Sequence, residues 1–159
     1  MFDRLIELLQ TQLVLYGELL ASSRQKKVNL LNNDIKAIRR VTASENSLIG
    51  KLQRLERERE SLTADIAGRL NIPLGGLTLA TLVSHINDNT ARNRLDSLRM
   101  RLRAGMDELK SVNEQNQAII NQSLEYIDFS MNLLRSSVSG PVYAGAEEIH
   151  GQVFFDARG

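Results

Sequence analysis

The sequence contains no cysteine and no tryptophan, and only two of its 159 residues are proline. Without cysteine there are no disulfides, no thiolate catalysis and no cysteine-ligated metals. Aromatic residues make up 4% of the chain, and the frequent turn signals and β-branched or aromatic runs of a sandwich or barrel are missing. Leu, Arg, Glu, Asn and Ser dominate instead, which is typical of long helices. The predicted fold class is therefore all-α.

The chain also lacks a strong net charge, a long apolar run and the features of a signal peptide. Its formal net charge is +1, so no global field favours nucleic acid or anionic lipid. No apolar run approaches the roughly 18 residues needed to span a bilayer. The first ten residues, MFDRLIELLQ, contain Asp3 and Glu7 and no basic region. We therefore expect a soluble, cytoplasmic protein without membrane insertion.

Apolar residues at helical spacing predict three long helices, over about residues 2–31, 34–70 and 78–135. The first shows a coiled-coil-like seam in which apolar residues recur in steps of three and four: Leu5, Leu9, Leu13, Tyr16 and Leu20. The third is predicted either to break near residues 88–92 or to continue through this polar run.

Capping residues and helix breakers mark the boundaries between these helices. Asn33 or Asp34 can accept hydrogen bonds from the first N–H groups of the second helix. Pro73 and the glycine pair at 75–76 predict a loop after the second helix. Thr78 is a suitable N-cap for the next helix. The sequence thus predicts a loop around Pro73 and a break near Asn33 and Asp34, with a helix continuous through residues 30–34 as the alternative.

The seam of the second helix contains two charged residues, Glu45 and Arg59, among seven apolar ones. They are fourteen residues apart, about 21 Å along a helix axis, so they cannot pair with each other within one chain. Each must find another partner or extend into water. If each charge pairs with a residue of another helix, the two pairs would fix the register of the bundle.

Together these patterns predict an elongated antiparallel coiled-coil bundle of three to four long helices over residues 1–135, followed by a non-helical C-terminal tail, 136–159. The tail is rich in Ser and Gly and includes Pro141, which disfavours a helix. It nevertheless contains Tyr143, Phe154 and Phe155, whereas solvated tails are poor in aromatics. We expect it to dock, either on its own bundle or on a partner.

The stretch from Asn113 to Arg135 carries the main functional signal. One helical stripe runs along it in steps of four, four, three, four and three: Asn116, Ile120, Leu124, Ile127, Met131 and Leu134. Six amides lie in its first half, whereas its second half is apolar. Such a helix can hold a register and then offer an apolar surface, with Tyr126 or Phe129 nearby. The same residues fit an internal core equally well.

The sequence contains no complete motif for catalysis, metal binding or nucleic-acid binding. No supporting pattern accompanies His85 or His150 for a catalytic triad. The Glu147-x-x-His150 spacing lacks the second motif and further Glu residues that a di-iron bundle needs. The densest basic run has no interleaved aromatics for stacking on bases: Arg92, Arg94, Arg99, Arg101 and Arg103. We therefore predict no enzyme activity, no cofactor, no metal and no nucleic-acid partner.

Four patches, in order along the chain, resemble the FlgN family of flagellar export chaperones. The first is Leu15-Tyr16-x-x-Leu19-Leu20, and the second is Glu45-x-x-Leu48 followed by Leu52-x-x-Leu55-Glu56-x-x-Arg59. The third is Thr78-Leu79-x-x-Leu82. The fourth and strongest is the stretch Asn113 to Leu134, and Tyr143 with Gly145 is similar to a Tyr-Gly element that follows the last helix in relatives.

This resemblance implies a chaperone that binds the C-terminal amphipathic helical region of flagellar hook-associated (junction) proteins. It would prevent their premature assembly and deliver them to the membrane gate of the flagellar type III export apparatus. An amphipathic helix laid into an apolar groove is a common recognition mode. The implied client-binding residues are Asn116, Ile120, Leu124, Tyr126, Ile127, Phe129, Met131 and Leu134, and the implied export-gate docking residue is Tyr143.

The residues alone leave a second hypothesis open. A structural coiled-coil adaptor or tether that self-associates, for example as a homodimer, would use the same seams without delivering a client.

Overall fold

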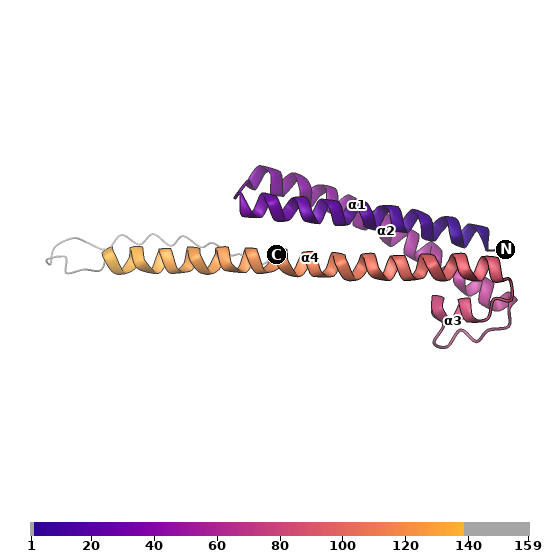
Figure 1. Ribbon diagram of the computed structural model, residues 1–159. Helices are drawn as coiled ribbons and strands as arrows, with labels where there is room; N and C mark the ends of the chain where they lie inside the picture. Colours follow the sequence, from indigo (N-terminus) through magenta and orange to yellow (C-terminus); the bar gives the residue numbers. More distant parts are fainter. Residues whose placement is uncertain (1, 139–159) are drawn as a thin grey trace. The chain divides into compact units, whose positions relative to one another are not determined.

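The computed structural model describes residues 2–138, which form four helices and no strand. The helices are α1 (Asp3–Leu31), α2 (Ile35–Arg69), α3 (Leu79–Ser84) and α4 (Asn89–Val138). The all-α prediction is confirmed. Figure 1 shows their order along the chain. The chain divides into two units, residues 1–123 and residues from Leu124 onward, and each is described by itself.

α1 and α2 form an antiparallel hairpin whose connection follows the predicted capping chemistry. Asn33 adopts a positive φ of 53°, a conformation that Asn tolerates better than most residues. The Asp34 side chain then accepts a hydrogen bond of 3.0 Å from the Ala37 N–H and caps α2. Pairs such as Arg4 with Glu58 and Lys26 with Glu45 set the antiparallel register.

The predicted third helix is two helices, separated at residues 85–88. The Thr78 hydroxyl accepts from the Thr81 N–H at 3.0 Å and starts α3, as predicted. α3 ends after six residues, and the Asp88 carboxylate accepts hydrogen bonds from Thr90 N–H (2.8 Å) and Ala91 N–H (3.2 Å) at the start of α4. The polar run therefore begins after α3 has ended, and its first residue, Asp88, caps α4.

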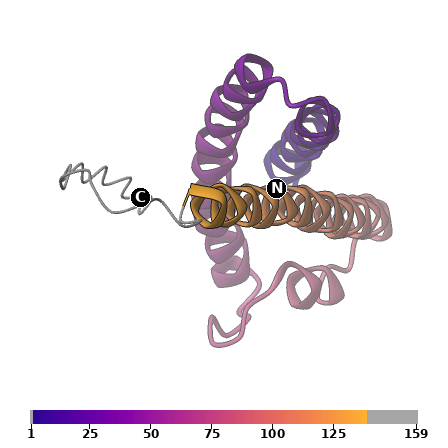
Figure 2. The ribbon, with the colours of Figure 1, turned by 90° about the vertical axis from the view of Figure 1, so that its left-hand side faces the viewer.

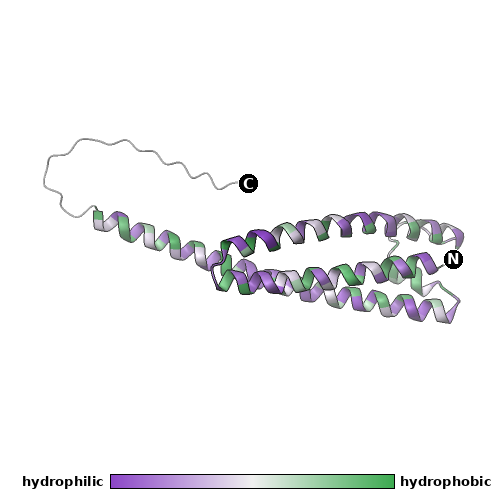
Figure 3. Cartoon of the chain, turned by 90° about the horizontal axis from the view of Figure 1, so that it is seen from above, coloured by the Kyte–Doolittle hydropathy of each residue, from purple (hydrophilic) through white to green (hydrophobic). Residues whose placement is uncertain are grey.

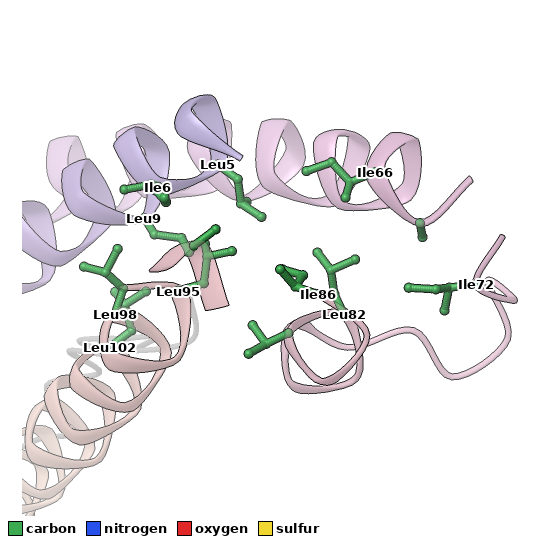
Figure 4. Close-up of a cluster of buried hydrophobic side chains, with 13 residues drawn as sticks. Leu5, Ile6, Leu9, Ile66, Ile72, Leu82, Ile86, Leu95, Leu98 and Leu102 are labelled. Carbon is green, nitrogen blue, oxygen red and sulfur yellow. The ribbon is translucent and has the colours of Figure 1, made fainter. Parts of the chain in front are cut away.

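The main hydrophobic cluster lies where α3 meets the three long helices. Its buried members come from α1, α2, α3, α4 and the connections around α3, with Leu5, Leu82 and Leu95 completely buried. Figure 4 shows Leu82 and Ile86 pointing toward side chains of the other helices. Fully burying each such side chain contributes about 1.5–3 kcal/mol, so α3 is held by packing although it is too short to be stable alone.

Farther along the hairpin, a smaller cluster contains Leu19, Leu48 and Leu52, with Tyr16 and Leu109 partly buried against it. Beyond this cluster the contacts between helices become polar. The Ser23 hydroxyl donates to Glu45 at 2.9 Å, and Lys26 Nζ lies 2.8 Å from the second oxygen of Glu45. Glu45 is only 7% exposed. Its buried carboxylate is therefore paired with side chains of α1 rather than with water.

The other seam charge, Arg59, pairs within its own helix. It donates to Glu56 at 2.6 and 2.8 Å, and Gln12 of α1 donates to the same carboxylate at 3.0 Å. The hydrogen bonds from Arg59 hold the pKa of Glu56 below its ordinary value, although partial burial acts in the opposite direction. Arg59 is therefore linked to Gln12 of α1 through Glu56.

α4 continues to Val138, three residues past the predicted end of the last helix. Ser136 and Ser137 occupy this extension, and their hydroxyls donate to the Leu133 and Leu134 carbonyls, each at 2.8 Å. Such bonds let serine remain in a helix. The rest of the predicted tail, including Phe154 and Phe155, lies outside the described residues.

Candidate functional site

Exposed apolar side chains concentrate on the last part of α4. Sixteen large hydrophobic side chains are exposed among the described residues, and eight of them fall within the fifteen residues Leu124–Val138. Single exposed hydrophobic residues are normal on a protein surface. A contiguous group of eight on one helix is not, and it marks an interaction surface. Figure 3 shows hydrophobic residues recurring along this part of α4.

Six of the eight predicted client-binding residues belong to this segment. They are 46–72% exposed: Leu124, Tyr126, Ile127, Phe129, Met131 and Leu134. Among the described residues no neighbouring helix buries them. The sequence reasoning missed Leu133 (53% exposed) and Val138 (74% exposed). Leu133 lies off the predicted stripe, and Val138 lies beyond the predicted helix end.

The exposed residues occupy two faces of the helix. Each residue advances about 100° around an α-helix axis, so Leu124, Ile127, Met131 and Leu134 share one face, together with Val138. Tyr126, Phe129 and Leu133 share another, centred roughly 150° away by the same geometry. The two aromatic side chains are therefore not beside the predicted stripe.

Small side chains separate the two faces. Ser130 lies between them, and its hydroxyl donates to the Tyr126 carbonyl at 2.8 Å. Ser137, one heptad later, donates in the same way to Leu134. Because these hydroxyls are satisfied within their own helix, covering them removes no hydrogen bond to water. We call the two faces and the serines between them the apolar arc.

The charged side chains of the segment lie on the remaining side of the helix: Glu125, Asp128 and Arg135. The arc between them spans about 220° at 100° per residue, whereas the apolar stripe of a helix with one buried side is about 100° wide. One helix laid along this surface would leave part of it exposed. The arc is wide enough for two elements.

The other two predicted residues, Asn116 and Ile120, belong to the first unit. Asn116 is 4% exposed, and its Nδ2 donates to the Ser23 carbonyl of α1 at 2.9 Å. Ile120 is half-buried. Asn116 thus holds α4 against α1, as expected for the amide-rich half of the stripe. The other amides in this half are exposed, and Gln117 donates to Asn121 along the helix at 3.0 Å.

Within residues 2–138 there is no group of three or more His, Asp or Glu side chains that could hold a metal ion. The His85 ring Nδ1 lies 2.8 Å from the Thr81 carbonyl of its own helix. No described helix is long and apolar enough to cross a membrane. His150 and the predicted gate-docking residue Tyr143 lie outside the described residues.

Comparison with protein-family models decides what kind of protein carries this surface. Residues 1–147 match the model of the family described as FlgN protein. The chain belongs to the FlgN family. The match covers all four helices and confirms the resemblance read from the four sequence patches. Comparisons with curated proteins and with solved structures gave no match.

Membership of the FlgN family makes this chain a flagellar export chaperone in the general sense. Chaperones of this family bind flagellar hook-associated proteins. The exposed apolar arc offers hydrophobic surface on a preformed helix.

Proposed function

We propose that this FlgN-family chain is a cytoplasmic export chaperone that holds the C-terminal amphipathic helical region of a hook–filament junction protein on its apolar arc. The observation that supports this proposal is the concentration of exposed apolar side chains on Leu124–Val138. Contact between the arc and the client's apolar face removes both from water. Assembly contacts made by the same client face are then blocked until release.

The width of the arc specifies how the client binds. A single client helix covers one face of Leu124, Ile127 and Met131, and a second client element covers the face of Tyr126, Phe129 and Leu133. Delivery to the export gate is the second half of the proposed role, and Tyr143 stays the predicted docking residue for it. Self-association as a tether is the competing use of the same surface.

The proposal is tested by replacing an exposed apolar residue on the arc with Asp. We expect Ile127→Asp to weaken binding of a purified hook-associated protein at least about thirtyfold, because a central interface residue contributes about 2 kcal/mol or more. Binding is measured by titration calorimetry. The melting temperature should not change, since Ile127 is 53% exposed.

Val14→Asp is the matched control. Val14 is also β-branched and lies in the interior of a helix, on α1, and it is 61% exposed. This variant should bind the client like the wild type. Equal binding by both variants, or a stable dimer that takes up no client, would contradict the proposed function.

A further inference from the structure

Three hollows follow one another along the first unit and form a continuous furrow. Their volumes are about 440, 470 and 300 Å³. Tyr16 and Met106 line both the first and the second hollow, and Asn113 and Gln117 line both the second and the third. Because neighbouring hollows share residues, we treat them as one surface and call it the furrow.

The furrow runs along α1. Its base is a helical stripe with steps of three and four: Leu9, Gln12, Tyr16, Leu19, Ser23 and Lys26. These positions span 17 residues, about 26 Å at 1.5 Å per residue. α4 lines all three hollows, and α2 lines the first and the third. A surface of this length along two long helices has the dimensions of a helix-binding groove.

α3 occupies the continuation of this groove at one end. Residues Leu77, Thr78 and Leu79, at the start of α3, line the first hollow. From there α3 packs Leu82 and Val83 into the cluster shared with the long helices. Figures 1 and 2 show α3 on the side of α4 away from α1. α3 thus acts as a fourth helix of the bundle for six residues only, and the furrow continues its interface.

The other end of the furrow contains a buried acceptor without a partner. Asn116 lines the third hollow, and its Oδ1 is buried and accepts no hydrogen bond from any described residue. An unsatisfied buried polar group costs about 1–3 kcal/mol. A ligand that brings a hydrogen-bond donor to this position would remove that cost.

We infer that the furrow binds an amphipathic α-helix of about five turns, supplied by the hook-associated client, as the fourth helix of the bundle. This inference rests on the proposed function for the identity of the client. The helix needs apolar residues toward Tyr16, Met106 and Leu109, which line the furrow and are not fully buried. It needs a donor such as Asn, Gln, Ser or Thr opposite Asn116.

A matched pair of substitutions on α4 tests the furrow. Met106 lines it and is 49% exposed, whereas Met100 lines none of the hollows and is 60% exposed. We expect Met106→Glu to weaken binding of a purified full-length hook-associated protein about tenfold, because it places a charge against the client's apolar face. Met100→Glu should bind like the wild type. Melting temperatures of both variants confirm that the bundle is intact.

Cross-linking locates the bound segment directly. Because the chain has no cysteine, Asn113→Cys and Met100→Cys each provide a single site for a benzophenone label. We expect a cross-link from position 113 to a helical segment of the client and little from position 100. The cross-linked peptides are identified by mass spectrometry.

The outcomes separate this inference from the proposed function. Client binding that persists with equal affinity in both Met→Glu variants, and without a cross-link from position 113, overturns the furrow inference and leaves the proposed function intact. A cross-link from position 113 to a second copy of the chain also overturns it. Failure of the unmodified protein to bind any hook-associated protein overturns both.

Discussion

Polar side chains inside the bundle specify how the helices align. Glu45 receives hydrogen bonds from Ser23 and Lys26 of α1, while Asn116 of α4 donates to the backbone of Ser23. One position on α1 therefore contacts both α2 and α4. A shift of either helix by one turn would leave a buried charge or amide unpaired, which costs several kcal/mol. Apolar contacts alone tolerate such shifts more easily.

The Glu56–Arg59 pair gives the bundle a pH-dependent contribution to stability. Arg59 lowers the pKa of Glu56 from its ordinary value of 4.5. A carboxyl with a lowered folded-state pKa stabilises the folded protein above its unfolded pKa, and this contribution is lost as pH falls through the folded value. Glu56→Gln should therefore lower the urea midpoint at pH 7, and the difference from the wild type should shrink below about pH 4.5.

Asp65→Asn is the control for this titration, because Asp65 lies on the same helix, is exposed and does not contribute to the shifts of Glu56 or Arg59. Its urea midpoint should follow the wild type at every pH. A Glu56→Gln difference that stayed constant from pH 7 to pH 3 would show that the pair contributes nothing through its charge.

At the scale of helices, short polar side chains determine where each one begins. Asp34 caps α2, Thr78 caps α3, and Asp88 accepts from the first N–H groups of α4. Each supplies an oxygen to backbone donors that the helix itself leaves unsatisfied. The same chemistry explains why residues 78–138 form two helices. Asp88 competes with a continuous helix, and the break frees α3 to pack against the core.

Removing the cap of α2 should have a defined cost. We expect Asp34→Ala to lower the free energy of unfolding by about 1 kcal/mol, the usual value of an N-cap. Chemical denaturation at pH 7 measures this change. Arg40→Ala, at an exposed position of the same helix, should change stability by less than about 0.5 kcal/mol. Equal effects of the two substitutions would contradict the role of the cap.

On the scale of the whole molecule, the buried core and the exposed apolar arc lie in different parts of the chain. Every buried hydrophobic residue of the described chain lies between Leu5 and Val112, within the first unit. The apolar arc begins at Leu124 and contributes no buried residue. A chaperone surface that must be covered by a client cannot also be covered by its own core.

A fragment of residues 1–123 should therefore fold without the arc. We expect its melting temperature to lie within about 4 °C of the full chain, corresponding to less than about 1 kcal/mol. It should bind the hook-associated protein far more weakly than the full chain in calorimetry. Loss of cooperative unfolding in the fragment would show that residues from Leu124 onward support the bundle.

Much of the fold was predictable because its signals are local. The seams of α1 and α2, the caps at Asp34 and Thr78 and the loop around Pro73 each depend on a few neighbouring residues. The candidate site was predicted in part. The stripe from Leu124 to Leu134 follows from helical spacing, but its exposure does not, because an apolar stripe looks the same whether it faces a core or a client.

The sequence by itself determined that this chain forms long helices, where α2 and α3 start, and which family it belongs to, since helical periodicity, capping and family motifs depend on the order of the residues alone. Only the tertiary structure decided which apolar stripes are covered. It buried the stripe of α4 up to Asn116 against α1 and left the stripe beyond Leu124 exposed. It also placed α3 at one end of a furrow. Burial depends on which helix lies opposite each side chain, and that pairing is a property of the packed molecule.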